Sequence, residues 1–369
     1  MVCHTIRAPG RAMTSLVLLL LLLVASPGLA VGQARKELRV GVVGYGYWGP
    51  NIVRNLRGLE GCRVAMVCDK SAAALKRLKQ AYPDQAVTAD PSELLKSTQI
   101  DAVAVVTPVG THFEIAKAAL QNGKHVFIEK PFTATTQQAE ELIELAERKN
   151  LRIMVDHTFL FTGAVRKMRQ LIDEGVLGDL YYYDSTRVNL GLFQHDVSVI
   201  WDLAPHDLAI MDFLIQDRPE AVVATGEAHL NGHVDVAFLT IYFPRNTIAH
   251  INVNWLSPVK IRTTLIGGEK KMLVWNDLEA DEKIKIYDKG AQMNNGQGLY
   301  DLLVSYRSGD MWAPRVEQTE ALKVELNYFL DCIAKNQTPF NDGVAGSRVV
   351  RMLEAADQSL KERGRAVRL

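Results

Sequence analysis

Residues 38–49 read LRVGVVGYGYWG, a short apolar run that passes directly into a glycine-rich turn. An apolar run of this length, ended by glycine, is typical of a buried strand. Similar runs follow at residues 63–68, 102–106, 125–128 and 152–155. Helical segments are expected between them at residues 72–81, 112–121 and 136–149, and Ser71 and Thr111 are suitable N-caps for the first two. This alternation predicts a doubly wound parallel sheet, an α/β fold of the Rossmann type.

The glycine-rich turn has the spacing Gly-x-Gly-x-x-Gly between a strand and a helix. The first glycine allows the tight turn, the second lets a pyrophosphate approach the backbone, and the third lets helix and strand pack closely. Asp69 ends the second strand about 20 residues further on, where an acid contacts the adenosine ribose of a dinucleotide. NAD is favoured over NADP because a carboxylate repels a 2′-phosphate, although Lys70 keeps NADP open. The expected cofactor-binding residues of the turn are Gly44, Tyr45, Gly46, Tyr47, Trp48 and Gly49.

Two later strands of the same pattern end in polar clusters. Thr107 and Pro108 follow one strand, with His112 beyond them, and Glu129 and Lys130 follow the next. The carboxyl ends of parallel strands form the ligand crevice in such sheets. We therefore expect these residues to line the cofactor crevice, with Lys130 beside the nicotinamide and on the reacting oxygen. An ordinary solvated charge pair at a strand end is the alternative.

After about residue 158 the pattern changes to strand-like segments joined by short turns. These segments lie at residues 180–188, 221–228, 234–243, 247–255, 260–266 and 271–274. Helices are expected at residues 163–174, 316–334 and 347–362. The pattern predicts a C-terminal α+β domain with a large, mostly antiparallel open sheet.

Residues 201–207 read WDLAPHD and form the polar cluster of this second half. Pro205 suits the first turn of a helix. Asp202 and His206 are four residues apart, so on a helix they share one face. A carboxylate beside an imidazole can fix its tautomer and raise its basicity, which makes His206 a candidate general base supported by Asp202. A capping Asp with a surface His is the alternative.

Together these motifs resemble the glucose–fructose oxidoreductase/inositol dehydrogenase family, also called Gfo/Idh/MocA, over about residues 37–369. The resemblance implies a nicotinamide-dependent enzyme in which Lys130 and His206 act at the reacting carbon, with Asp202 in support. It also implies a homodimer or homotetramer, because the second sheet of the family often packs against another subunit. We divide the chain into a leader (1–35), an NAD(P)-binding Rossmann domain (36–157) and a substrate-binding and oligomerisation domain (158–369).

Three segments, residues 44–51, 187–191 and 201–207, are similar to the branch that oxidises UDP-linked N-acetylated sugars or their uronates at the third ring carbon. We therefore expect hydride transfer between a nicotinamide and a secondary alcohol or ketone of a sugar. An exported aldose–aldose oxidoreductase, a polyol dehydrogenase and a cofactor-binding sensor without turnover are the alternatives. The substrate-side candidates are Lys130, His157, Arg187, Asn189, Asp202 and His206.

Composition narrows the class of partner. Lys and Arg together number 42, as do Asp and Glu, which argues against a nucleic-acid partner held by a basic face. Cys3, Cys62, Cys68 and Cys332 are scattered without a Cys-x-x-Cys pair, so neither a metal site nor a disulfide framework is indicated.

The first 35 residues have the composition of a targeting segment. Arg7 and Arg11 precede an apolar run at residues 16–25, and small residues follow it, as in a secretory signal. The run is too short for a comfortable membrane span. We favour a cytoplasmic protein because a soluble nicotinamide cofactor is expected to be scarce outside the cytoplasm, and export through residues 1–34 remains the alternative.

Overall fold

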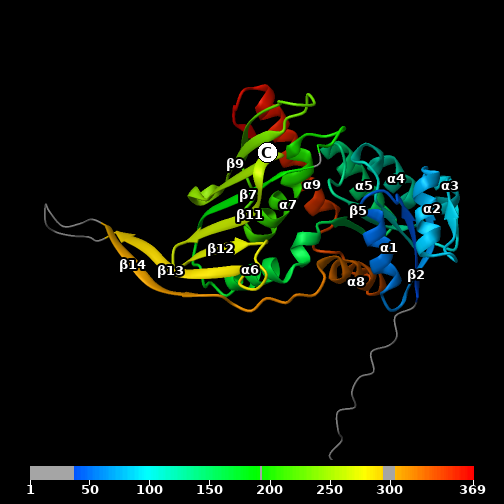
Figure 1. The fold of residues 1–369 in the computed structure, drawn as a ribbon, viewed down its shortest axis with the longest axis horizontal. Helices are drawn as coiled ribbons and strands as arrows, with labels where there is room; N and C mark the ends of the chain where they lie inside the picture. Colours follow the sequence, from blue (N-terminus) through cyan, green and yellow to red (C-terminus); the bar gives the residue numbers. More distant parts are fainter. Residues whose placement is uncertain (1–36, 192, 294–303) are drawn as a thin grey trace, which may run out of the picture. The chain divides into compact units, whose positions relative to one another are not determined.

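The computed structural model describes residues 37–191, 193–293 and 304–369. The expected leader therefore lies outside the described residues. The elements form two sheets with helices against them (Figure 1).

The first sheet is parallel and has the strand order β3-β2-β1-β4-β5-β6. Its strands are β1 (Leu38–Val43), β2 (Cys62–Cys68), β3 (Val87–Thr88), β4 (Ala102–Val105), β5 (His125–Glu129) and β6 (Ile153–Asp156). Strands such as β4 are buried along their whole length because helices cover both faces of the sheet. The predicted doubly wound fold is confirmed.

Helices connect these strands by crossovers. They are α1 (Gly49–Arg57), α2 (Ala72–Ala81), α3 (Pro91–Lys96), α4 (His112–Gln121) and α5 (Thr136–Arg148), with a short 3₁₀ turn η1 (Val109–Thr111) before α4. Ser71 caps α2 as predicted, since its side chain accepts a hydrogen bond from the Ala74 amide. Thr111 precedes the described helix α4 without capping it, because its hydroxyl instead bonds to Thr107 Oγ1 and the Pro108 carbonyl.

The second sheet has nine strands in the order β14-β13-β12-β11-β7-β10-β9-β8-β15. Its strands are β7 (Leu180–Leu190), β8 (Ala221–Glu227), β9 (Val236–Tyr242), β10 (Ile248–Asn254), β11 (Leu256–Gly268), β12 (Met272–Asn276), β13 (Ile284–Met293), β14 (Val304–Trp312) and β15 (Val367–Arg368). Among the described strand pairs of this second sheet only β7 and β10 run parallel, so the prediction of a mostly antiparallel sheet is confirmed.

Helices cover one face of this second sheet. They are α6 (Gly163–Asp173), α7 (Val199–Leu214) and α9 (Gly343–Lys361), and the same half has short 3₁₀ turns η2 (Thr158–Phe161) and η3 (Pro244–Asn246). Helix α8 (Ala321–Ala334) packs against η2. Helix α7 packs on β7, β9 and β10, and α9 packs on β8. Helices α8 and α9 also reach the first sheet, where they pack against α1 and α5 respectively.

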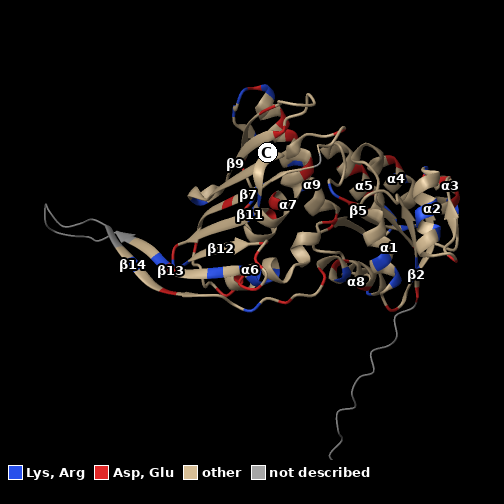
Figure 2. Ribbon diagram, viewed as in Figure 1, with Lys and Arg blue, Asp and Glu red and all other residues tan. Residues whose placement is uncertain are grey.

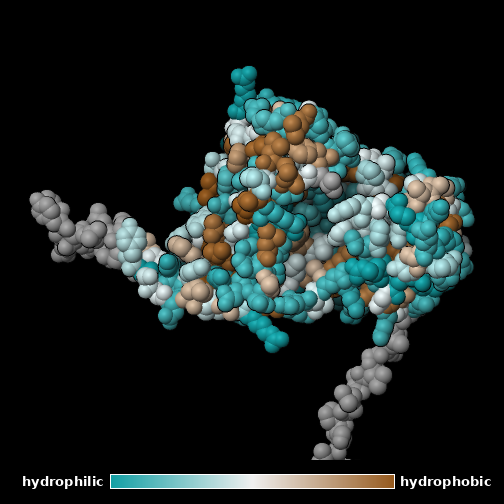
Figure 3. All heavy atoms as spheres, viewed as in Figure 1, coloured by the Kyte–Doolittle hydropathy of each residue, from teal (hydrophilic) through white to brown (hydrophobic). Residues whose placement is uncertain are grey.

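The sheet's two faces differ as the alternation of side chains requires. Along β9, Ala237, Leu239 and Ile241 are buried toward the helices, whereas Phe238 and Tyr242 are exposed on the other face. In the space-filling view, hydrophobic and polar side chains lie in alternating bands over the strands of this sheet (Figure 3). The exposed face therefore carries large apolar side chains with no helix above them in the described part of the chain.

Three expectations about the second half are wrong in detail. Strands β13 and β14 were not expected, because their residues include Lys285, Asp288 and Arg307 and lack a continuous apolar run. Helix α8 begins later than predicted, and α9 begins earlier, after the Asp342 N-cap. Helix α7 begins at Val199, so Pro205 lies inside the helix and not in its first turn.

Charged residues of both signs are interspersed along the two sheets and their helices (Figure 2). Across residues 37–191, 193–293 and 304–369, every helix is too short or too polar to cross a bilayer.

Candidate active site

The glycine-rich turn joins β1 to α1 at the carboxyl end of the first sheet. Gly44 has a φ of +105°, and a Cβ there would lie 2.1 Å from the Val106 carbonyl oxygen, so both backbone shape and space require glycine. A Cβ on Gly49 would lie 2.4 Å from the Gly44 oxygen. At Gly46, by contrast, no other described heavy atom lies within 4 Å of the added Cβ. The turn is therefore closed on the protein side and open where a pyrophosphate would approach.

Side chains of the turn divide between protein and solvent. Tyr45 is buried in the core and Tyr47 is exposed. The Trp48 indole points inward and donates to Asp156 Oδ2 at 3.0 Å. The Asp69 carboxylate accepts hydrogen bonds from the Tyr45 amide at 2.6 Å and the Ser71 amide at 2.7 Å. Asp69 thus lies at the glycine turn, as a ribose-binding acid requires, and its half-exposed side chain can reach a ligand there.

The buried imidazole of His112 connects two loops of the crevice. Its Nε2 lies 2.7 Å from the Thr107 carbonyl oxygen, and its Nδ1 lies 2.9 Å from the Pro131 carbonyl oxygen. Burial lowers the pKa of His112 below its ordinary value. Pro108 and Thr107 follow β4 beside this ring. His112 therefore connects the two loops that line the crevice. Its side chain contributes to a cofactor site by fixing the positions of these loops.

Lys130 follows β5 and reaches across to helix α7. Its Nζ donates to the Asp202 carbonyl oxygen at 2.7 Å and lies 3.4 Å from Asp202 Oδ1. The preceding residue, Glu129, accepts a hydrogen bond from the Lys130 amide. This contact joins the end of the first sheet to the helix that carries His206, so the structure brings together two motifs about 70 residues apart in the sequence.

Buried carboxyl groups lie behind Lys130 on the side of the first sheet. Asp156 and Glu325 are buried and Glu129 is half-buried; desolvation raises the pKa of each above its ordinary value, with repulsion between neighbouring carboxyls adding to the effect at Glu129 and Glu325. Asp156 and Glu325 share a hydrogen bond, which requires a proton on one of the two carboxyls. Asn341 Nδ2 donates to Glu325 Oε1 at 3.3 Å. Burial therefore favours the uncharged form of these carboxyl groups.

Helix α7 presents Asp202 and His206, and no direct hydrogen bond joins their side chains in the described structure. The Asp202 carboxylate turns to Lys130 and to Trp255, whose Nε1 donates to Asp202 Oδ2 at 3.2 Å. His206 Nδ1 is buried and has no hydrogen-bond partner among the described residues. Burial, together with the positive charges of Lys130, Arg187 and Arg262, holds the pKa of His206 well below its ordinary value. The imidazole is therefore neutral at pH 7.

Arg187 lies on β7 facing α7, where it forms an ion pair with Asp207. Its Nε donates to Asp207 Oδ2 at 2.5 Å and its Nη2 to Asp207 Oδ1 at 3.3 Å. The guanidinium lies over the Phe159 ring, with Cζ 4.4 Å from the ring centroid. The centroid of the same ring is 5.0 Å from that of His206. The structure thus places the predicted Arg187 beside the predicted base.

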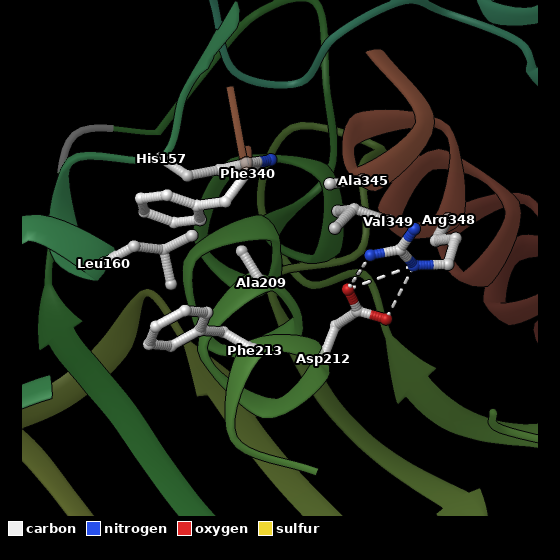
Figure 4. A pocket seen from close by; sticks show the side chains of 9 residues that line it. All are labelled: His157, Leu160, Ala209, Asp212, Phe213, Phe340, Ala345, Arg348 and Val349. Carbon is white, nitrogen blue, oxygen red and sulfur yellow. Dashed lines mark hydrogen bonds and ion pairs between the residues drawn. The ribbon is translucent and has the colours of Figure 1, made fainter. Parts of the chain in front are cut away.

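His157 follows β6 and is buried, with both ring nitrogens unpartnered within the described part of the chain. Burial, with the charges of Lys130 and Arg348, lowers the pKa of His157 to about 3. A cavity of about 130 Å³ lies beside it. Figure 4 shows Asp212 and Arg348 paired on one side of this cavity and the apolar side chains Leu160 and Phe213 on the other.

Asn189 lies two residues beyond Arg187 on the same face of β7. A Cβ added to Gly191 would lie 2.7 Å from Asn189 Nδ2 and 3.3 Å from Trp255, the tryptophan that bonds to Asp202. Sequence reasoning missed three residues that contact the predicted ones, Phe159, Asp207 and Arg262, and a fourth, Glu325, that lies beside Asp156. Asp207 stands within the quoted 201–207 segment, and the period-two alternation of β11 could have marked Arg262. Nothing in the local sequence marks Glu325.

Comparisons with known proteins identify the family. Residues 38–157 match a family model described as "Oxidoreductase family, NAD-binding Rossmann fold". Residues 165–274 match the GFO/IDH/MocA C-terminal domain. The chain belongs to the Gfo/Idh/MocA family. Its first sheet is therefore an NAD-binding Rossmann domain, and the predicted oxidoreductase class, fold class and cofactor are confirmed.

Several Gfo/Idh/MocA relatives cover nearly the whole chain. UDP-N-acetylglucosamine 3-dehydrogenase of Acidithiobacillus ferrooxidans is 30% identical over 323 residues, which are 85% of this chain and 94% of that protein. The NAD(+)-dependent scyllo-inositol 2-dehydrogenase of Bacillus subtilis is 24% identical over 317 residues, which are 82% of this chain and 88% of that protein.

Solved structures of the family agree with the fold. A structure of the Acidithiobacillus ferrooxidans enzyme superposes with a TM-score of 0.74 at 26% identity, covering 88% of this chain and 98% of the other. A scyllo-inositol dehydrogenase from Lactobacillus casei, with NAD(H) and scyllo-inositol bound, has a TM-score of 0.74 at 20% identity, covering 90% and 99% of the two chains. At that identity the likeness concerns the fold alone.

Proposed function

We propose that this Gfo/Idh/MocA protein is a sugar dehydrogenase that interconverts a secondary alcohol and a ketone with NAD. The observation that carries the proposal is the contact between Lys130 Nζ and Asp202, one helical turn before His206. It supports the interpretation that Lys130, from the cofactor domain, and the neutral imidazole of His206, on helix α7, act at one site. The names of the relatives support a sugar or cyclitol as the substrate.

The residues divide the chemistry between them. NAD held at the glycine turn would supply the acceptor for the hydride that leaves the carbon carrying the hydroxyl. His206, which is neutral, accepts the hydroxyl proton as the carbonyl forms, and the proton then passes to solvent. Lys130 donates a hydrogen bond to the substrate oxygen and stabilises its developing negative charge. Asp202 holds Lys130 in place through its carbonyl and carboxylate oxygens, and Trp255 holds the Asp202 carboxylate.

The remaining predicted residues have supporting roles in this proposal. Gly44, Gly46 and Gly49 form the pyrophosphate turn, and Asp69 binds the adenosine ribose and favours NAD over NADP. The exposed Tyr47 lies at the same turn. His157, Arg187 and Asn189 face the substrate. The division of the chain at residues 157 and 158 into cofactor and substrate domains remains part of the proposal, since α8 and α9 pack against helices of the first sheet as well.

The substrate class is tested by a direct screen. Purified full-length protein is incubated with NAD⁺ and, separately, with UDP-N-acetylglucosamine, its uronate, free aldoses and inositols, and NADH formation is followed by absorbance. We expect at least one UDP-linked N-acetylated sugar to be oxidised faster than any inositol. The absence of turnover with every compound and with either cofactor would contradict a dehydrogenase and favour the sensor alternative. Copurification of stoichiometric NADP would favour the aldose–aldose oxidoreductase.

We also propose that the exposed face of the second sheet packs against another copy of the chain. Phe238, Tyr242, Ile248, Ile261 and Leu265 are exposed on β9, β10 and β11, and register pairing places Tyr242 opposite Ile248. An apolar surface of this kind is typical of a subunit interface. Light scattering of the eluting protein should give a dimer or tetramer, and Ile248→Lys should shift it toward the monomer. A monomeric wild-type protein would contradict this proposal.

We place the reaction in the cytoplasm, because the proposed enzyme needs a renewable supply of NAD. Fractionation of cells that express the full chain should recover the NAD-dependent activity with cytoplasmic markers. Recovery outside the cytoplasm, with the chain shortened by about the length of residues 1–34, would favour export.

A further inference from the structure

Two arginines lie directly opposite each other on the inner face of the second sheet. Arg187 on β7 and Arg262 on β11 are register partners. Their guanidinium carbons lie 4.4 Å and 5.6 Å from the same Phe159 ring centroid, so both side chains project to the same side of the sheet. Like charges at directly opposed positions destabilise a sheet. An arrangement with this cost is explained if something negative binds there.

The protein's own acids satisfy these arginines only in part. Asp207 accepts from Nε and Nη2 of Arg187 and also from Ser185, but Nη1 of Arg187 is buried and has no hydrogen-bond partner in the described residues. Within the described residues the Arg262 guanidinium forms one ion pair, in which Nη1 lies 3.4 Å from Asp277 Oδ2. A buried guanidinium N–H without an acceptor is costly, so this site has a free donor for a ligand oxygen.

The arginine pair also lies beside the proposed base. The Phe159 ring that both guanidiniums face is 5.0 Å from the His206 ring, centroid to centroid. Both charges lower the pKa of His206. We therefore expect a ligand bound to the two arginines to reach the carbon from whose hydroxyl His206 takes the proton. The negative charge of the ligand would raise the pKa of the imidazole when substrate binds.

We propose that Arg187 and Arg262 bind an anionic substituent of the sugar substrate, a carboxylate or a phosphate, close to the carbon that is oxidised. The inference rests on the proposed dehydrogenase function and narrows its substrate class to acidic sugars. The planar fork of arginine matches the two oxygens of either anion, and hydrogen bonds between two charged groups are stronger than neutral ones.

The test compares matched sugars on the wild-type protein and on Arg262→Gln, with Arg262→Lys as the conservative variant. Arg307→Gln is the control, because Arg307 has the same 34% side-chain exposure as Arg262, pairs with one aspartate, and lies on β14, three strands away from β11. The sugars are glucose, glucuronate, glucose 6-phosphate, UDP-N-acetylglucosamine and the uronate of the last. Arg187 itself is not replaced, since its buried ion pair also supports the fold.

We expect acidic sugars to have a kcat/KM at least tenfold above neutral glucose. Arg262→Gln should raise KM for the acidic sugars by roughly tenfold or more and should change KM for the neutral sugar much less. Arg262→Lys should recover part of the loss, and Arg307→Gln should behave as wild type. If Arg262→Gln raises KM for the uronate of UDP-N-acetylglucosamine but not for UDP-N-acetylglucosamine itself, the bound anion is a carboxylate. If it raises KM equally for both, the bound anion is a phosphate.

A binding measurement separates this inference from the proposed function. Calorimetric titration of the uronate and of UDP-N-acetylglucosamine into the protein saturated with NADH needs no turnover. Weaker binding of an acidic sugar to Arg262→Gln supports the anion site even if no sugar is oxidised, in which case the dehydrogenase proposal alone fails. Efficient oxidation of neutral sugars with no preference for acidic ones, or an equal loss for every sugar in Arg262→Gln, overturns the anion site and leaves the dehydrogenase intact.

Discussion

The two sides of the candidate site bury opposite types of ionisable side chain, acidic on one side and basic on the other. On the side of the first sheet lie carboxyl groups, Glu129, Asp156 and Glu325, whose pKa values are raised by burial. On the side of the second sheet lie Arg187 and the partly buried Arg262, next to His206, whose pKa is held well below its ordinary value by burial and by nearby cations.

The difference shows how one physical effect can produce two chemical environments. Burial penalises the charged form of any side chain, so it raises the pKa of the acids on one side and lowers the pKa of the histidine on the other. The arginines remain charged because their ordinary pKa is too high for burial to neutralise them, and Asp207 and Asp277 compensate them. Lys130 and Asp202 bond to each other where the two sides meet.

The largest expected effect comes from breaking the buried ion pair on the cationic side. Asp207→Ala should reduce the free energy of unfolding by about 3–5 kcal/mol, because it leaves the Arg187 guanidinium buried without a counter-charge. Urea unfolding at pH 7 measures this change. Asp217→Ala is the control, because Asp217 pairs with the exposed Arg245 and should contribute no more than about 1 kcal/mol. Equal losses in the two variants would show that the Arg187 pair is effectively solvated.

Removing either group at the boundary should abolish most of the turnover. Lys130→Met and His206→Asn should each lower kcat by roughly a hundredfold or more, because each group acts on the reacting oxygen or its proton. NADH binding, followed by fluorescence, should survive His206→Asn, since His206 lies on α7 and outside the glycine turn. Lys149→Met, at an exposed lysine that bonds only to a backbone carbonyl in the described structure, is the control. Turnover within threefold of wild type in both variants would contradict the shared site.

Asp69 lies at the first sheet but outside the group formed by Glu129, Asp156 and Glu325. We expect its carboxylate to determine the preference for NAD over NADP. Asp69→Ala should narrow the ratio of kcat/KM for NAD to that for NADP by roughly tenfold, mainly through poorer use of NAD, because the carboxylate no longer accepts from the ribose hydroxyls. Steady-state kinetics with each cofactor gives this ratio. A wild-type protein that already prefers NADP strongly would show that the assignment of Asp69 is wrong.

The acidic side can be tested through the pH dependence of stability. The pKa of Glu325 is raised in the folded protein, so its contribution to stability is present at low pH and is lost as pH rises toward the folded-state pKa. Glu325→Gln cannot ionise and can still donate to Asp156. Its free energy of unfolding, relative to wild type, should therefore be higher at pH 8 than at pH 5 by about 1 kcal/mol or more. Glu144→Gln, on the exposed face of α5, should show no such difference.

The smallest effect is expected on the pH profile of oxidation. Because the folded-state pKa of His206 is lowered, its neutral form persists at pH values where an ordinary histidine would already be charged. As pH falls from about 7.5 to about 5.5, kcat/KM should change by less than roughly twofold, whereas an ordinary histidine would lose roughly tenfold over the same range. A half-maximal rate near pH 6.5 would mean that substrate or solvent relieves the burial of the imidazole.

Local sequence was sufficient for five strands of the first sheet and its cofactor turn, whereas the two-residue strand β3 was not predicted. Residues 38–49 determine a strand, a tight turn and a helix start within a dozen positions, and Gly44 and Gly49 are required by contacts with neighbouring backbone. Asp69 follows at the end of the next strand. Such a site is predictable because the positions of its residues follow from short-range geometry and from the regular order of parallel strands.

Tertiary structure alone decided how the second side was assembled. The sequence indicated Arg187 and His206, but only the register of β7 with β11 places Arg262 opposite Arg187, and only the packing of α8 brings Glu325 to Asp156. The tertiary structure also decided that Asp202 bonds to Lys130 and Trp255 and not to His206. Contacts of Asp202 with residues of both sheets compete with the contact that a spacing of four residues on a helix allows. Composition and periodicity determine which faces are buried, whereas burial and pairing between distant elements set the charge of the groups that meet there.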